Sequence, residues 1–187
     1  MSAQTLNEET TKVTMKSASI RRSRIKYLTI TGVMAAMITI MTAYICHIPI
    51  GTNGGYVHFG DGLIYIAATL LPTPYALAAA AIGGGLADLL TAPMWTIATI
   101  IIKMVITIPF TNKSQKIITP RNVIATVIAF LLSGTGYYIA EAILFGTETA
   151  FLMSLSGSFV QSFGSAIVFI IFGLFLDRIS FKSRSLN

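Results

Sequence analysis

Charged side chains are scarce in this chain: they make up 11% of its 187 residues, while 54% of the residues are hydrophobic. A soluble domain usually carries about 25% charged residues. The apolar residues form long continuous runs, and several runs are long enough to cross a hydrocarbon layer of ~30 Å. Continuous rather than alternating runs favour helices over a membrane β-barrel. The sequence therefore predicts an all-α membrane protein.

Cysteine is almost absent, since Cys46 is the one cysteine of the chain. A single cysteine excludes an internal disulfide and a metal cluster held by thiolates. His47 and His58 are isolated histidines, and two such residues do not make a metal site. The sequence shows neither a nucleophile paired with a base nor a phosphate-binding loop. We therefore expect no enzymatic activity, no metal and no cofactor bound by this chain itself.

Six apolar segments, separated by short turns, are predicted to form transmembrane helices. Residues 46–60 contain four glycines and no Lys or Arg, which predicts a loop after the first segment. We expect residues 1–26 to be a disordered or interfacial cytoplasmic basic tail. Residues 27–177 would form the six-helix transmembrane substrate-binding domain, and residues 178–187 a second cytoplasmic basic tail. The six segments are Tyr27–Ile45, Tyr56–Leu71 (short), Tyr75–Leu90, Trp95–Phe110, Asn122–Phe145 and Leu155–Leu176.

The basic residues are unevenly distributed, and this distribution predicts the orientation. Six lie before the first segment, three in the loop after the fourth and three after the sixth, while Lys103 alone lies within a segment. Lys and Arg are enriched in cytoplasmic loops of membrane proteins. Both termini are therefore predicted to be cytoplasmic. The net charge of +6 is explained by this topology and does not indicate nucleic-acid binding.

Several ionisable residues lie in or beside the apolar segments, where a charge costs roughly 3 kcal/mol or more and usually serves a function. At a helical rise of ~1.5 Å per residue, the polar groups of the third to sixth segments fall in the outer half of the membrane. We expect them to line a cavity that opens to the outside. Lys103 would form its floor, and its walls would come from Asp88, Tyr137, Glu141 and Gln161.

Each of these residues also has a structural interpretation. Asp88 and Lys103 can form an ion pair, Glu141 can lie at the membrane interface, and Tyr137 and Tyr138 can belong to an aromatic belt. The polar stripe on the sixth segment, which includes Gln161, is equally compatible with helix packing. The small residues Gly32, Ala35 and Ala36 on the first segment fit either internal packing or a docking face for a partner subunit.

Three stretches of the sequence resemble a known family. The segment LTITGVMAAMITIMTAY, with Gly32 four residues before Ala36, is similar to a first helix with an AxxxA motif. The stretch YVHFGDGLIYIAATLLPTPYALAAAAIGGGLADLL is similar to an "HxGD…LAD" pattern, and WTIATIIIK ends at Lys103. Together these features resemble the substrate-binding S components of energy-coupling factor (ECF) vitamin transporters, most nearly the hydroxymethylpyrimidine-type members.

The resemblance implies a multi-pass subunit of the bacterial plasma membrane that binds a water-soluble vitamin from outside. Its expected partners are a transmembrane coupling protein of the EcfT type and two cytoplasmic ATPases of the EcfA type, which would use the ATP. The Gly32, Ala35 and Ala36 face would dock the coupling protein. Substrate would lie beneath the loop after the first segment. The candidate substrate-binding residues are Asn53, His58, Asp61, Asp88, Trp95, Lys103, Tyr137, Glu141 and Gln161.

The sequence leaves the identity of the ligand open. Our first choice is hydroxymethylpyrimidine, a thiamine precursor, because both signs of charge, hydroxyls and an amide suit a small polar heterocycle. Pantothenate, pyridoxine, riboflavin and cobalamin are alternatives. A different class of function, a stand-alone secondary carrier or channel, would require an inverted repeat or a continuous polar path. Neither is evident in the sequence.

Overall fold

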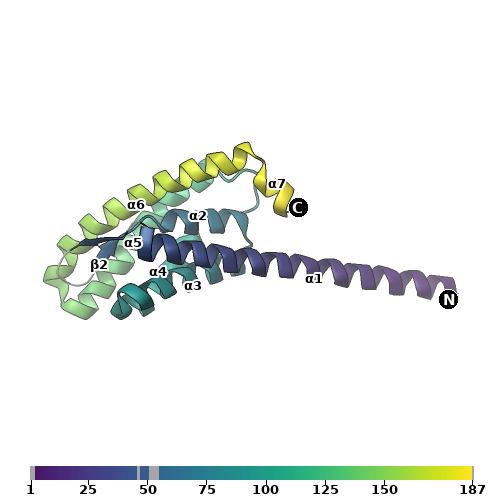
Figure 1. Ribbon diagram of the computed structural model, residues 1–187, viewed down its shortest axis with the longest axis horizontal. Coiled ribbons are helices and arrows are strands. Elements are labelled where there is room, and N and C mark those ends of the chain that lie inside the picture. Colours follow the sequence, from purple (N-terminus) through teal and green to yellow (C-terminus); the bar gives the residue numbers. More distant parts are fainter. Residues whose placement is uncertain (1–2, 46, 51–54, 187) are drawn as a thin grey trace.

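The protein is a bundle of helices with one small β-hairpin (Figure 1). The computed structural model describes residues 3–45, 47–50 and 55–186, with side chains described for residues 11–45, 47–49, 56–146 and 157–184. The elements in chain order are α1 (Ala3–Ile40), the π-helical turn η1 (Met41–Ile45), β1 (Ile48–Ile50), β2 (Gly55–Val57), α2 (Asp61–Leu70), α3 (Thr73–Thr91), the 3₁₀ turn η2 (Pro93–Trp95), α4 (Thr96–Thr107), α5 (Pro120–Phe145), α6 (Thr147–Arg178) and α7 (Phe181–Leu186).

The first helix is much longer than the apolar run within it. The sequence predicted a disordered or interfacial tail up to residue 26, but α1 is one continuous helix from Ala3 and projects far from the bundle (Figure 1). The reason is local: no Pro or Gly occurs before Gly32, so nothing in the segment breaks the helix. The described side chains of residues 11–25 are all exposed.

The glycine-rich connection after α1 contains more regular structure than a loop. β1 and β2 pair as antiparallel strands, with Ile48 opposite Val57 and Pro49 opposite Tyr56. Tyr56 and Val57 therefore belong to the hairpin and not to the second helix, which begins at Asp61. We call the end of the bundle that carries this hairpin the hairpin end.

The short second helix is the centre of the molecule. All ten residues of α2 are buried, and the helix packs against α1, α3, α4 and α6. Its length of about 15 Å is half of what a bilayer crossing requires. Tyr65 of α2 stacks on Phe110, with ring centroids 4.8 Å apart, and meets the edge of Phe169 at 6.0 Å. The second predicted span is thus a core helix surrounded by protein.

The structure supports a multi-pass membrane protein but does not confirm six spans. Within the described residues, four helical stretches are long and apolar enough to cross a membrane: Thr11–Ile45, Thr73–Thr91, Pro120–Phe145 and Gly157–Arg178. The apolar helices Asp61–Leu70 and Pro93–Thr107 are shorter. The prediction counted apolar runs, and a run that is buried in protein has the same composition as one that faces lipid.

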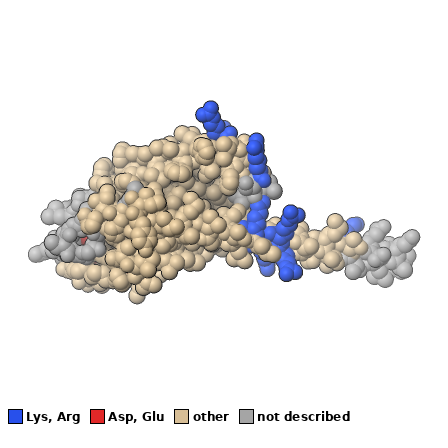
Figure 2. Space-filling model, viewed as in Figure 1, with Lys and Arg blue, Asp and Glu red and all other residues tan. Residues whose placement is uncertain are grey.

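Both chain termini lie toward the end of the bundle opposite the hairpin (Figure 1), which we call the termini end. The visible Lys and Arg side chains lie at the termini end of the bundle and on the projecting part of α1 (Figure 2). Lys103, on α4, differs from these residues because it is fully buried inside the bundle. The basic residues that cluster in the sequence therefore also cluster at one end of the structure.

Candidate functional site

A buried ion pair joins the second and fourth helices. The Lys103 ammonium lies 2.7 Å from Asp61 Oδ1 and donates a hydrogen bond of 3.0 Å to Oδ2, and both side chains are fully buried. Gln161 on α6 donates a second hydrogen bond to Asp61 Oδ2, also at 3.0 Å. Asp61 occupies the first turn of α2, where a negative charge interacts favourably with the helix dipole. Three helices therefore meet at this one carboxylate.

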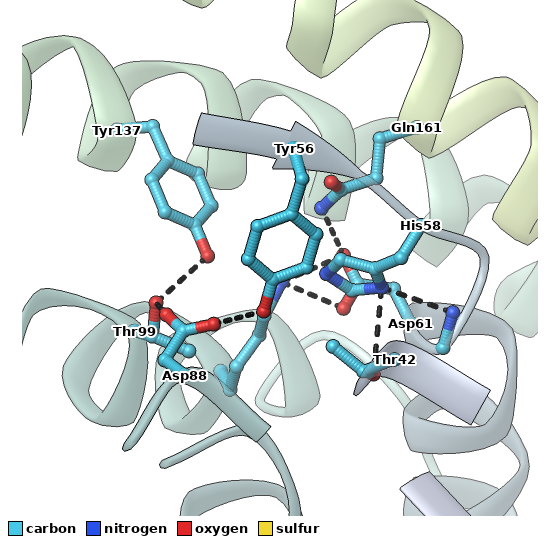
Figure 3. A network of polar contacts seen from close by, with 10 residues as sticks. Thr42, Tyr56, His58, Asp61, Asp88, Thr99, Tyr137 and Gln161 are labelled. Carbon is cyan, nitrogen blue, oxygen red and sulfur yellow. Dashed lines mark hydrogen bonds and ion pairs between the residues drawn. The ribbon is translucent and has the colours of Figure 1, made fainter. Parts of the chain in front are cut away.

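The second buried carboxylate, Asp88 on α3, is held by hydroxyl groups instead of a cation. Tyr56 from the hairpin donates to Asp88 Oδ1, and Thr99 from α4 donates to Oδ2 (Figure 3). Thr99 Oγ1 also lies 3.1 Å from the Tyr137 hydroxyl on α5. The hairpin is thereby tied to the helices through the hydroxyl of Tyr56.

The two carboxylate groups belong to one continuous network. The Lys103 ammonium lies 5.2 Å from the centroid of the Tyr137 ring, within cation–π distance. Tyr137 contacts Thr99, and Thr99 contacts Asp88. An Asp88–Lys103 ion pair, one of the sequence interpretations, is not formed: Lys103 pairs with Asp61. The central position of α2, which brings Asp61 to α4, explains the difference.

His58 lies beside this network, in the connection between β2 and α2. Its Nδ1 accepts a hydrogen bond from the Gly60 backbone N–H at 3.1 Å and lies 3.5 Å from Thr42 Oγ1. Burial, assisted by the nearby Lys103 charge, lowers the pKa of His58 to about 3. The ring is therefore neutral at physiological pH, and it serves as a hydrogen-bonding group without adding charge.

Trp95, at the end of η2, and Glu141, on α5, extend the site. Trp95 is 5% exposed and meets the Tyr137 ring edge-on, with centroids 6.2 Å apart. Its indole N–H is buried without a hydrogen-bond partner among the described atoms. Glu141 is buried one helical turn beyond Tyr137. Tyr138, by contrast, is 36% exposed, in keeping with a position at the surface of the bundle.

The structure thus brings six of the predicted residues into one region: His58, Asp61, Asp88, Lys103, Tyr137 and Gln161 (Figure 3). Trp95 and Glu141 adjoin it, and Asn53 lies outside the described residues. The polar stripe of α6 faces inward, because Ser158 and Ser165 are buried together with Gln161. That these groups bind a substrate stays a prediction.

Sequence reasoning missed three members of the network: Thr42, Tyr56 and Thr99. Thr99 lies four residues before Lys103, so helical spacing places both on one face of α4 and could have indicated it. Tyr56 and His58 are two residues apart, which puts them on one side of an extended strand. His47 stacks on Tyr56 with ring centroids 3.9 Å apart. Nothing in the local sequence indicates Thr42.

The predicted docking face divides into a buried and an exposed part. Ala35 is 5% exposed and packs internally, because α1 crosses close to Gly83 of α3: a Cβ at Gly83 would lie 2.9 Å from the Ala35 carbonyl oxygen. Ala35 is therefore not available to a partner, which corrects that part of the prediction. Gly32 and Ala36 are exposed, and a Cβ added at Gly32 would meet open space.

Comparisons with known proteins agree with the helical membrane bundle. A protein from Pyrococcus woesei, described as "Uncharacterized protein in gap 3'region", is 35% identical over 63 residues, which is 34% of this chain and 43% of that protein. The chain thus matches less than half the length of that relative. The family described as "ECF-type riboflavin transporter, S component" matches residues 22–178, nearly the whole bundle. The chain therefore belongs to this family of ECF transporter S components.

Proposed function

We propose that this chain is the substrate-binding subunit of an ECF-type importer and that the polar network at the hairpin end holds a water-soluble vitamin. The family match supports the role, and the network supports the location. The chain would take up its ligand from outside and deliver it inward together with a coupling protein of the EcfT type and two ATPases of the EcfA type. Those partners, and not this chain, would use ATP.

The orientation that this role requires has a physical basis. The basic residues gather at the termini end (Figure 2), and Lys and Arg flank membrane helices mainly on the cytoplasmic side. We infer that both termini are cytoplasmic and that the hairpin end faces outward across the bacterial plasma membrane. In this orientation the hairpin, which Tyr56 ties to Asp88, covers the site from the side on which a vitamin arrives.

The chemistry of the region favours a planar heteroaromatic ligand. The rings of Tyr56, Trp95 and Tyr137 offer stacking surfaces, and the buried Trp95 N–H requires an acceptor that the described atoms do not supply. A ring nitrogen or carbonyl of a heteroaromatic vitamin is such an acceptor. The hydroxymethylpyrimidine subtype expected from the sequence gains no support from the family description, which names riboflavin. We therefore place riboflavin first and hydroxymethylpyrimidine second.

The exposed small residues of α1 are the proposed contact with the coupling protein. Gly32 and Ala36 lie four residues apart, so they share one helix face, and their small size allows another helix to approach closely. Leu28, Val33 and Met37 are exposed on the same helix and would add apolar contact area.

Binding by the isolated chain is the test of this function. The purified subunit should bind one vitamin in the absence of nucleotide, measured by native mass spectrometry and titration calorimetry with riboflavin and hydroxymethylpyrimidine. Gln161→Ala and Trp95→Phe should each weaken binding at least tenfold, because each removes a buried hydrogen-bonding group. Phe172→Ala, on an exposed part of α6, is the matched control.

Two results would count against the proposal. Unchanged affinity in both site variants would remove the assignment of the network as the binding site. Ion-driven flux of the vitamin in liposomes that contain this chain alone would instead indicate a stand-alone secondary carrier.

A further inference from the structure

Two carbonyl groups at the C-terminal end of α2 lack backbone N–H donors. Pro72 and Pro74 follow the helix and carry no N–H, so the carbonyls four residues earlier, at Ala68 and Leu70, have no helical partner. The carbonyl between them, at Thr69, accepts a hydrogen bond of 2.7 Å from the ammonium of Lys182. A side chain from the far end of the sequence therefore completes the last turn of the buried helix.

Lys182 is held firmly in this position. It lies on α7, is 7% exposed, and donates a second hydrogen bond of 2.6 Å to the Asn112 carbonyl in the loop after α4. Asp177, at the end of α6, accepts backbone hydrogen bonds from Ile117 and Ile118 in the same loop at 2.7 and 2.9 Å. A cation at a helix C-terminus is also favoured by the helix dipole. Helices α6 and α7 and the loop after α4 are thus joined by hydrogen bonds to one another and to the C-terminal end of α2.

The side-chain hydrogen bonds and the ion pair that join α2 to other helices lie at its two ends. Asp61 contacts Lys103 and Gln161 at one end, and Thr69 contacts Lys182 at the other, about 12 Å away along the helix. Between them the buried surface of the helix is largely aliphatic. Apolar contacts are non-directional, so they fix the position of a helix along its axis less strictly than the charge-assisted hydrogen bonds at its ends.

We propose that Lys182 is a positioning residue for the binding network. By holding the Thr69 carbonyl, it sets the position of α2 along its axis, and this places the Asp61 carboxylate at Lys103 and Gln161. Removing the Lys182 ammonium lets α2 shift and loosens those contacts at the opposite end of α2. The consequence for vitamin affinity rests on the proposed function, while the consequence for Lys103 does not.

The test measures the NMR signal of the Lys103 ammonium group in the absence of a ligand. In protein labelled with ¹⁵N-lysine, the Lys103 ammonium signal is identified by its loss in Lys103→Arg. Lys182→Met, which keeps an unbranched chain but removes the charge, should shift this signal, and Lys182→Gln should shift it less. Lys182→Arg should restore it, because a guanidinium can also donate to two carbonyls. Lys116→Met removes an exposed lysine from the same loop region and should leave the signal unchanged.

Riboflavin titration of the same variants separates the two proposals. A shifted Lys103 signal with riboflavin affinity weakened about tenfold in Lys182→Met supports both. A shifted signal with unchanged riboflavin affinity supports the positioning role and contradicts the network as the vitamin site. An unshifted signal in folded Lys182→Met and Lys182→Gln, even with a lower midpoint of thermal unfolding, overturns the inference, since Lys182 would then stabilise the fold without placing Asp61.

Discussion

Two hydroxyl groups determine how the Asp88 carboxylate is accommodated inside the bundle. Tyr56 and Thr99 each donate to one of its oxygens. A carboxylate that accepts such bonds in a water-poor interior is stabilised, and loss of one donor leaves an acceptor unsatisfied. The hydrogen bond from the Tyr56 hydroxyl to Asp88 also joins the hairpin to α3.

Tyr56→Phe should therefore destabilise the protein by about 1–3 kcal/mol, the cost of leaving a buried acceptor without its partner. The measurement is thermal or denaturant unfolding in detergent. Tyr44→Phe removes a hydroxyl from a tyrosine that is 67% exposed and serves as the control. Equal stability of the two variants would mean that the Tyr56–Asp88 contact contributes nothing net.

His58 gives the protein a defined pH dependence. Its pKa falls from 6.5 to about 3 on folding because the ring is buried. Between these values the unfolded chain binds a proton that the folded protein does not bind. Stability contributed by the neutral ring is therefore fully present above pH 6.5 and is lost as the pH falls, by at most about 1.4 kcal/mol per pH unit.

The corresponding measurement compares the unchanged protein with His58→Gln at pH 7.5, 6.0 and 5.0. The stability difference between them should shift in favour of His58→Gln as the pH decreases, because glutamine does not titrate. A difference that stays constant over this range would show that His58 is not buried in its neutral form.

The membership of the network was partly predictable from single residues. Asp61, Asp88 and Lys103 are conspicuous because charges are rare in apolar segments. Their pairing was not predictable, since it depends on which helices are neighbours: α2 lies between α4 and α6, and this brings Asp61 and not Asp88 to Lys103. Thr42 gave no signal because hydroxyl groups are common in helices and turns, and Tyr56 could have been indicated through its two-residue spacing from His58.

At the scale of elements, the close approach of α2 to α6 depends on a glycine. A Cβ at Gly62 would lie 2.7 Å from the Ser165 carbonyl oxygen and 2.8 Å from two atoms of Val168. The carbonyl belongs to the backbone of α6, so the strain cannot be relieved by rotating one side chain. Position 62 of α2 therefore has no room for a side chain.

Gly62→Ala should consequently destabilise the protein by about 1–3 kcal/mol, the usual cost of overpacking a core. Gly32→Ala is the control, because it makes the same replacement within a helix where nothing lies within 4 Å. That control should be neutral or slightly stabilising, since alanine favours helix by about 1 kcal/mol over glycine. Matching unfolding midpoints for the two variants would contradict the proposed close packing.

Helix existence followed from the apolar runs, whereas helix boundaries could be predicted only where prolines mark a turn. α3 and α5 begin within two residues of their predicted starts because Pro72, Pro74 and Pro120 mark those turns. α1 extends far beyond its apolar run, because polarity marks exposure to water and not loss of helix. α2 is shorter than predicted because the pairing of Tyr56 and Val57 with β1 takes residues from its start.

For the whole molecule, the division of small residues on α1 separates packing from assembly. Ala35 faces α3, while Gly32 and Ala36 face outward. If the exposed face docks the coupling protein, Ala36→Trp should prevent co-purification with that protein and leave riboflavin binding by the isolated subunit unchanged. A bulky side chain there prevents close helix approach without entering the core.

Val127→Trp is the matched control, because it adds the same side chain to an exposed position on α5. It should co-purify with the coupling protein as the unaltered subunit does. Normal assembly of Ala36→Trp, or equal loss of assembly in both variants, would remove the Gly32–Ala36 face as the docking site.

The unbroken course of α1 has a mechanical consequence. Residues 3–26 of this helix, which precede the apolar run that begins at Tyr27, are about 36 Å long. A rigid rod converts a change of angle at its base into a displacement at its tip. If the bundle reorients by about 20°, a typical tilt for a transmembrane helix, the tip moves sideways by roughly 12 Å. A probe near the beginning of α1 would therefore report small rocking motions of the subunit in the bilayer as large, easily resolved distances.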